Sequence, residues 1–137
     1  MSQTPQVALS VGDVVRVRVP WCRVYWHFGI VVECDVYGHV RIIHCSHRRR
    51  GVAIESLHDF AQGGTVENCG FLGELSVREI IRRAKSMIGK KWHLTDFNCE
   101  HFWMAAHGME PESHQLQMTV LAGAIGAFGV LLRKYAK

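Results

Sequence analysis

The pattern of hydrophobic and polar positions divides the chain into strands followed by helices. Valine and arginine alternate from Val15 to Val19, which is typical of a strand with one buried face. Aromatic and β-branched runs predict further strands at residues 24–33, 39–45, 52–55 and 65–71, with one helical turn at 56–60. Because the predicted strands precede the predicted helices, the order favours an α+β fold over an alternating α/β fold.

Two helices are expected in the second half of the chain. Residues 76–79 read Ser-Val-Arg-Glu, a capping box, and apolar residues recur behind it at helical spacing until Gly89. A second helix is predicted to begin at Cys99, just after the capping residue Asn98, and to end at Gly108.

The C-terminal segment, residues 118–137, differs from the rest because it carries no charge from Met118 to Leu132 and ends in basic residues. At about 1.5 Å per residue the uncharged stretch is roughly 22 Å long, short of the ~30 Å core of a bilayer. We predict a hydrophobic C-terminal helix that associates with a membrane. A glycine-rich helix that completes the core is the alternative.

Composition describes one globular domain that is large enough to bury a core, with 137 residues, 48% hydrophobic and 20% charged. We expect a flexible leader at 1–10, a folded domain at 11–117 and the tail at 118–137. The net charge of +4 is compatible with an anionic membrane surface or with nucleic acid and requires neither, and we do not expect nucleic acid as a partner. Five cysteines without a Cys-x-x-Cys pair, and no signal-peptide pattern, predict reduced thiols and a cytoplasmic, membrane-associated protein.

Candidate chemistry centres on one cysteine. Cys99 lies in the first turn of a predicted helix, where the helix dipole and free backbone N–H groups favour the thiolate, which is the nucleophilic form. His27, inside the second predicted strand, is the candidate base. The alternative is that Cys99 is only a small buried apolar residue.

Two sequence motifs favour a catalytic role for Cys99 over that of a buried apolar residue. Trp26-His27-Phe28-Gly29-Ile30, upstream of Asn98-Cys99-Glu100-His101-Phe102, resembles the H-box and NC-box of the lecithin retinol acyltransferase family. That family includes the H-Ras-like suppressor phospholipase/acyltransferases and the H-box/NC class of picornavirus 2A proteins. The resemblance covers roughly residues 11–117. It implies a permuted NlpC-type, papain-like thiol hydrolase fold, with an antiparallel β-sheet packed on helices.

The resemblance also implies roles for individual residues. Cys99 corresponds to the nucleophile and His27 to the general base and acid. The family's third residue is often a histidine at the end of the strand after the H-box strand. We assign it to His44, with His39, which better matches the family's shorter spacing, as second choice. Tyr25, on the same predicted strand face as His27, is a candidate substrate-binding residue or, equally, a core residue.

The remaining chemical features are less specific for a function. The Cys/His-rich stretch at 34–47 fits no common zinc-finger spacing, so we expect neither a metal nor a cofactor. The arginine run at 48–50 reads as a solvated loop, with phosphate contact as the alternative. Glu100 and His101 are expected to support the start of the helix rather than to transfer protons.

Two classes of function remain open. The first is a thiol-dependent phospholipid acyltransferase or phospholipase A-type hydrolase, in which an acyl thioester on Cys99 passes to water, an amine or an alcohol. Its partners would be a phospholipid or other acyl lipid and, through residues 118–137, a membrane. The second is a catalytically weak or inactive, viral 2A-like module that binds a host protein, a membrane or RNA. A cysteine peptidase is a third option with the same chemistry.

Overall fold

The protein folds around one antiparallel sheet with the strand order β4-β3-β2-β1-β5. The computed structural model describes residues 8–20, 22–110, 115, 117–118 and 120–123. The strands are β1 (Val14–Val19), β2 (Cys22–Cys34), β3 (Val40–Ser46), β4 (Gly51–Ser56) and β5 (Val66–Gly70). The helices are α1 (Leu57–Ala61), α2 (Val77–Ser86) and α3 (Cys99–Ala106). The predicted α+β class is confirmed, with the sheet packed on helices as the family resemblance implied.

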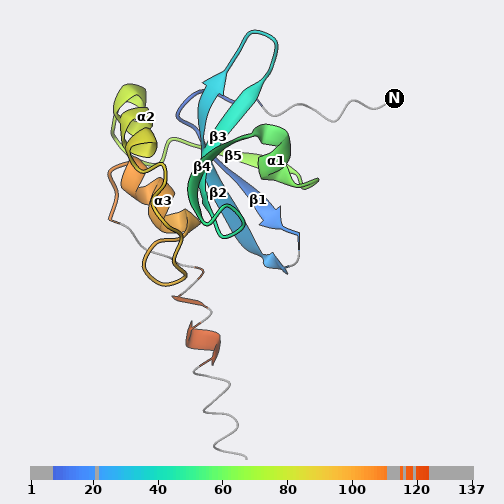
Figure 1. The fold of residues 1–137 in the computed structure, drawn as a ribbon, viewed down its shortest axis with the longest axis vertical. Coiled ribbons are helices and arrows are strands. Elements are labelled where there is room, and N and C mark those ends of the chain that lie inside the picture. The colour runs from blue at the N-terminus through green and yellow to red at the C-terminus, as the bar shows by residue number, and fades with distance from the viewer. Residues whose placement is uncertain (1–7, 21, 111–114, 116, 119, 124–137) are drawn as a thin grey trace, which may run out of the picture.

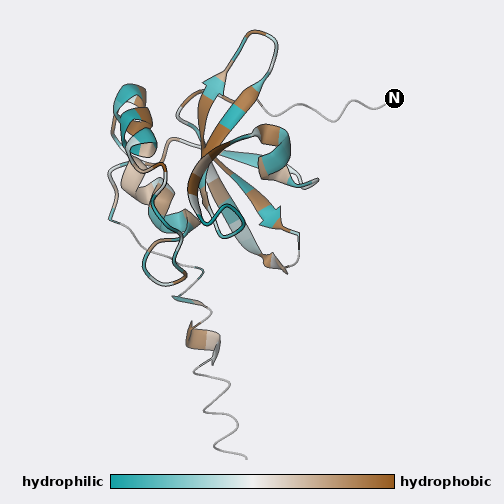
Figure 2. Cartoon of the chain, viewed as in Figure 1, coloured by the Kyte–Doolittle hydropathy of each residue, from teal (hydrophilic) through white to brown (hydrophobic). Residues whose placement is uncertain are grey.

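Helices cover both faces of the sheet (Figure 1). Helices α2 and α3 lie against one face, and the short helix α1 lies against the other. Because successive side chains of a strand point to opposite faces, neighbouring residues enter different cores. Val14 and Ile30 pack toward α2 and α3, whereas Val15 and Val31 pack with Phe60 of α1. Figure 2 shows that the strands carry hydrophobic stretches as well as hydrophilic ones.

The ladder between β2 and β3 is shorter than the ladder between β2 and β1. Strand β2 pairs with β3 from Cys34↔Val40 to Ile30↔Ile43, whereas its pairing with β1 continues past Trp26. The first half of β2 is therefore paired with β1 along one edge, whereas its pairing with β3 along the other edge has already ended. This is where the residues of both predicted motifs meet.

Both predicted helix starts are confirmed by their caps. The Ser76 hydroxyl accepts a hydrogen bond from the Glu79 N–H at the start of α2. The Asn98 side chain accepts from the N–H groups of Glu100 and His101 at the start of α3. His101 Nδ1 in turn accepts from the Asn98 N–H, which completes a capping box. His101 therefore supports the helix start, as the sequence predicted.

The predicted leader and tail fall largely on residues that are not described. Residues 1–7 of the leader and 124–137 of the tail lie outside the described part of the chain. Within the described part, no helix is long and apolar enough to cross a membrane. The described start of the tail is helical, and more than half of each of its larger apolar side chains is exposed, at Met118, Val120 and Leu121.

Candidate active site

The structure brings together the two histidines that were expected to act as base and orienting residue. His27 Nε2 lies 2.6 Å from His44 Nδ1, and the rings meet edge to face. Both rings also contact Phe60 of α1. His39, the second choice, lies in the β2–β3 turn instead, where it bonds Asp35 and its side chain is 80% exposed. His44 is therefore the histidine that can orient His27.

A carboxylate extends this pair, and the sequence analysis missed it. Glu55 Oε2 lies 2.9 Å from His44 Nε2, and the Glu55 side chain is only 5% exposed. Arg48 contacts both carboxylate oxygens, at 2.9 and 2.7 Å, and Arg49 contacts Oε1 at 3.2 Å. The loop is exposed, as expected, with the side chains of Arg48 and Arg49 about half exposed, but these two arginines also hold a buried carboxylate, which the sequence analysis did not predict.

The register of the β3–β4 hairpin explains why Glu55 reaches His44. His44 pairs with Ala53, so Glu55 lies two positions further along β4 on the same face. Such diagonal neighbours lie within reach of long side chains. The available sequence signal was a single charged residue at the end of an apolar strand, placed diagonally to His44 once the hairpin is paired.

The glycine of the upstream motif makes room for this cluster. A Cβ atom on Gly29 would lie 2.4 Å from Ile42 Cγ2 and 2.9 Å from Phe60 Cε2. Real Cβ atoms do not approach carbon this closely, so only glycine lets Phe60 pack down against β2. Phe60 then supports the rings of both His27 and His44.

The nucleophile candidate reaches β2 from α3, on the other side of the sheet from α1. Cys99 is the first residue of α3, and its Sγ lies 3.9 Å from the carbonyl oxygen of Trp26. The N–H of Phe28 acts on the same sulfur. The sulfur thus lies against the backbone on both sides of His27. The His27 ring itself packs against Phe60 on the α1 side, so proton transfer between Cys99 and His27 stays a prediction.

A residue beyond α3 returns to the same place. The side-chain amide of Gln115 accepts a hydrogen bond from the Trp26 N–H and donates one to the Trp26 carbonyl. The Gln115 N–H donates to Glu100 of α3. Gln115, shortly before the C-terminal segment, is therefore docked on β2 beside Cys99.

Burial keeps both histidines neutral. It lowers the pKa of His27 to about 3, with positive charge at His44 and Arg48 acting in the same direction and Glu55 opposing it. Burial, with Arg48 and Arg49, lowers the pKa of His44 to about 4. At neutral pH the contact between His44 and Glu55 is therefore a hydrogen bond from a neutral imidazole rather than an ion pair.

Burial also determines the protonation state of Cys99. It raises the pKa of Cys99 to about 11, although the N–H groups of Phe28, Glu100 and Cys99 itself act in the opposite direction. The expectation of a thiolate at rest is therefore wrong, because desolvation outweighs the helix start. Cys99 therefore rests as a neutral thiol, and His27 as a neutral imidazole.

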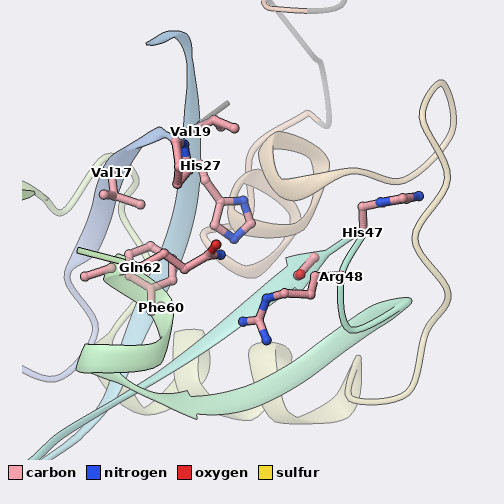
Figure 3. Close-up of a pocket in the computed structure, with 10 residues that line it drawn as sticks. Val17, Val19, His27, His47, Arg48, Phe60 and Gln62 are labelled. Carbon is pink, nitrogen blue, oxygen red and sulfur yellow. The ribbon is translucent and has the colours of Figure 1, made fainter. Parts of the chain in front are cut away.

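A cavity of about 280 Å³ opens beside His27 (Figure 3). Its lining is apolar on one side and polar on the other, and comprises Val17, Val19, Pro20, His27, Ser46, His47, Arg48, Phe60, Ala61 and Gln62. Tyr25 does not belong to this lining, so its role in substrate binding stays a prediction. In the described ranges, no group of three or more His, Cys, Asp or Glu side chains is arranged to hold a metal ion.

Comparison with protein-family models matches residues 7–109 to the model described as lecithin retinol acyltransferase. The matched range contains His27, His44, Glu55 and Cys99. A search of curated proteins gave no significant match.

Proposed function

Because the chain belongs to the lecithin retinol acyltransferase family, we propose that it transfers or hydrolyses phospholipid acyl groups through a thioester on Cys99. Membership in the family indicates acyltransferase or phospholipase-type activity in general, on phospholipid substrates. The thiol mechanism is our proposal. The observation that carries it is the 2.6 Å contact between His27 and His44, beside the strand segment that the Cys99 sulfur touches.

The first half-reaction forms the thioester. Cys99 Sγ attacks the ester carbonyl of the lipid as His27 takes the thiol proton at Nδ1, because Nε2 is held by His44. The carbon–sulfur bond forms, and the bond from the carbonyl carbon to the glycerol oxygen breaks. His27 gives the proton to that oxygen, so the lysolipid leaves neutral at the alcohol and His27 returns to its neutral form.

The second half-reaction releases the acyl group. Water, an amine or an alcohol attacks the thioester carbonyl while His27 takes a proton from the attacking group. The carbon–sulfur bond breaks, and the proton passes to the departing sulfur. The products are a fatty acid with water as acceptor, an amide with an amine and a new ester with an alcohol. Cys99 is again a thiol, which matches its neutral resting state.

Two features support such a substrate: the backbone at the start of α3 and the cavity beside His27, which Cys99 does not line. The N–H of Cys99, close to its own sulfur at the start of α3, is suited to stabilise the oxyanion that develops on the carbonyl. Val17, Val19 and Phe60 offer an apolar wall for an acyl chain, and the cavity lining also includes Arg48, a cation suited to phosphate.

We place this activity at the cytoplasmic surface of a membrane. The proposal is supported by the apolar composition of residues 118–132, the basic residues that follow them and the net charge of +4. Exposed Met118, Val120 and Leu121 at the start of the tail are suited to insert among lipid chains.

Turnover of vesicle lipid tests the proposal. Phosphatidylcholine vesicles with a radiolabelled acyl chain are incubated with wild type, Cys99→Ala, His27→Gln and the control Cys34→Ala, whose cysteine is exposed and far along β2. We expect label release from wild type and Cys34→Ala, none above background from Cys99→Ala, and a loss of about 10³-fold or more in His27→Gln. Folded wild type that binds the vesicles without turnover would contradict the proposal and favour a non-catalytic interaction module of the 2A type.

A further inference from the structure

We propose that Glu55 is a positioning residue that sets which nitrogen of His44, and through it which nitrogen of His27, carries the proton. The inference rests on the proposed function, because it assigns a role within the same site. It goes beyond the pair of histidines by adding a member from β4 that acts only through His44.

The first step concerns the charge of Glu55. Its side chain is almost fully buried, and a buried carboxylate persists as an anion where cations and hydrogen bonds hold it. Arg48 bonds both oxygens, and Arg49 lies 3.2 Å from Oε1. These are charge-assisted contacts to a carboxylate, and an ionised carboxylate only accepts hydrogen bonds.

The second step follows the protons. Glu55 accepts from His44 Nε2 at 2.9 Å, so this nitrogen carries the hydrogen. In a neutral imidazole the other nitrogen then has a free lone pair, so His44 Nδ1 is an acceptor. It lies 2.6 Å from His27 Nε2, which must therefore donate. His27 Nδ1 is left without a hydrogen, which is the state that a base needs in order to take the thiol proton.

The third step shows that no other charged neighbour prescribes the same pattern. His44 faces His27 on β2, Glu55 on β4, and the two arginines of the β3–β4 loop, which act on it as positive charges. From α1 the apolar ring of Phe60 packs against it. Among these neighbours, Glu55 is the one whose chemistry forces His44 to donate from Nε2.

Replacing the carboxylate by an amide is expected to reverse the pattern. In Glu55→Gln we expect the amide oxygen at the Oε1 position, because both Arg48 and Arg49 donate there, whereas the contact of Arg48 with the Oε2 position is lost. The amide NH₂ then faces His44 Nε2 and donates to it. His44 must carry its hydrogen on Nδ1 and donate to His27 Nε2, so the hydrogen of His27 moves to Nδ1 and the base is blocked.

Nitrogen NMR on the full chain tests this directly. We expect the ¹⁵N shifts of wild type to show both His27 and His44 protonated at Nε2 at pH 7, and those of Glu55→Gln to show both protonated at Nδ1. Glu79→Gln is the matched control, because Glu79 on α2 is also bonded by two arginines and touches no imidazole in the described contacts. It should keep the wild-type pattern.

A wild-type spectrum with either histidine protonated at Nδ1 would overturn the proposal, even if Glu55→Gln fails to fold. An unchanged pattern in folded Glu55→Gln would overturn it as well. These readouts do not depend on turnover. Predicted tautomers in a wild type without lipid turnover would leave the role of Glu55 intact and remove the proposed function instead.

Kinetics add a second readout. We expect kcat to fall about 10²-fold in Glu55→Gln with KM little changed, as is typical when a supporting hydrogen-bond partner is lost. Glu55→Asp keeps an ionised acceptor and should recover part of this loss, whereas Glu79→Gln should match wild type. A Glu55→Asp variant that is no better than Glu55→Gln would contradict the role of the charge.

Discussion

The two halves of the site are held in different ways. The base half is a chain of side-chain contacts across three strands, from His27 through His44 to Glu55, at 2.6 and 2.9 Å. The nucleophile half depends on the backbone: Cys99 begins a capped helix, and its sulfur lies against main-chain groups of β2. The difference indicates that the base half depends on the identity of each side chain, whereas the nucleophile half depends on the position of α3.

Burial has the same consequence in both halves, since it removes charge from each. It lowers the pKa of His27 to about 3 and raises the pKa of Cys99 to about 11. A preformed thiolate and imidazolium pair is therefore not the resting state. A general-base mechanism, in which the proton moves as the ester is attacked, fits this site better.

After the replacement of Cys99 or His27 themselves, the largest effect is expected from removing the middle of the base half. His44→Ala deprives His27 of its orienting partner, and we expect kcat to fall by about 10² to 10³-fold in the vesicle assay. The control is His39→Ala, which removes an exposed histidine of the β2–β3 turn and should leave kcat unchanged. Equal losses in the two variants would contradict the assignment of His44.

The pH dependence of thiol alkylation tests the neutral resting state. With the pKa of Cys99 raised to about 11, the thiolate fraction grows with pH throughout the usual range. The rate of Cys99 modification by iodoacetamide should rise about tenfold per pH unit, hence about 100-fold between pH 7 and 9. Peptide mapping measures it. A rate that is constant from pH 5 to 8 would instead reveal a thiolate stabilised by imidazolium.

The pKa shifts of the histidines make stability depend on pH as well. Both values are lowered from 6.5 in the folded protein, so the unfolded chain binds more protons below that pH. The contribution of the two histidines to stability is present above about pH 6.5 and is lost as the pH falls toward about 3. Urea unfolding at several pH values should show this decline, and His27→Gln should make it shallower. A wild-type stability that rises as the pH falls from 6.5 to 4 would contradict neutral burial.

Overpacking next to the His27 and His44 rings is expected to have a smaller effect. Gly29→Ala places a methyl group against Ile42 and Phe60, and overpacking of this kind costs about 1–3 kcal/mol of unfolding free energy. Turnover should also fall, because Phe60 supports both imidazoles. Gly38→Ala is the comparison, since nothing lies within 4 Å of its added Cβ and only its positive φ is strained. It should destabilise by about 1 kcal/mol and leave turnover unchanged.

The smallest stability effect concerns the nucleophile half. Asn98→Ala removes the cap of α3 and should cost about 1 kcal/mol in unfolding free energy. Ser76→Ala removes the cap of α2 at a similar cost, which makes it a matched control. If the position of α3 matters for Cys99, only Asn98→Ala should also lower turnover. Equal turnover in the two variants would contradict the claim that the cap of α3 positions Cys99.

Much of this arrangement could be predicted from local sequence patterns. Alternation, capping residues and glycines marked the strands and both helix starts. The two motifs marked Cys99 and His27, and the place of a histidine at the end of the following strand marked His44. The role of Glu55 could not be predicted, because it depends on the pairing of two strands in a hairpin, which places Glu55 diagonally to His44. The protonation states of Cys99 and the two histidines could not be predicted for a similar reason. Desolvation depends on residues that surround the site only in the folded chain.

The most direct test of the central claim is to find the acyl group on the protein. Wild type is mixed with an excess of phosphatidylcholine vesicles, quenched in acid within milliseconds to seconds, digested and analysed by mass spectrometry. The account predicts an acyl mass on the peptide that contains Cys99, removed by hydroxylamine and absent from Cys99→Ala. Lipid turnover with the acyl group on another residue, or with no covalent adduct at any time, would contradict it.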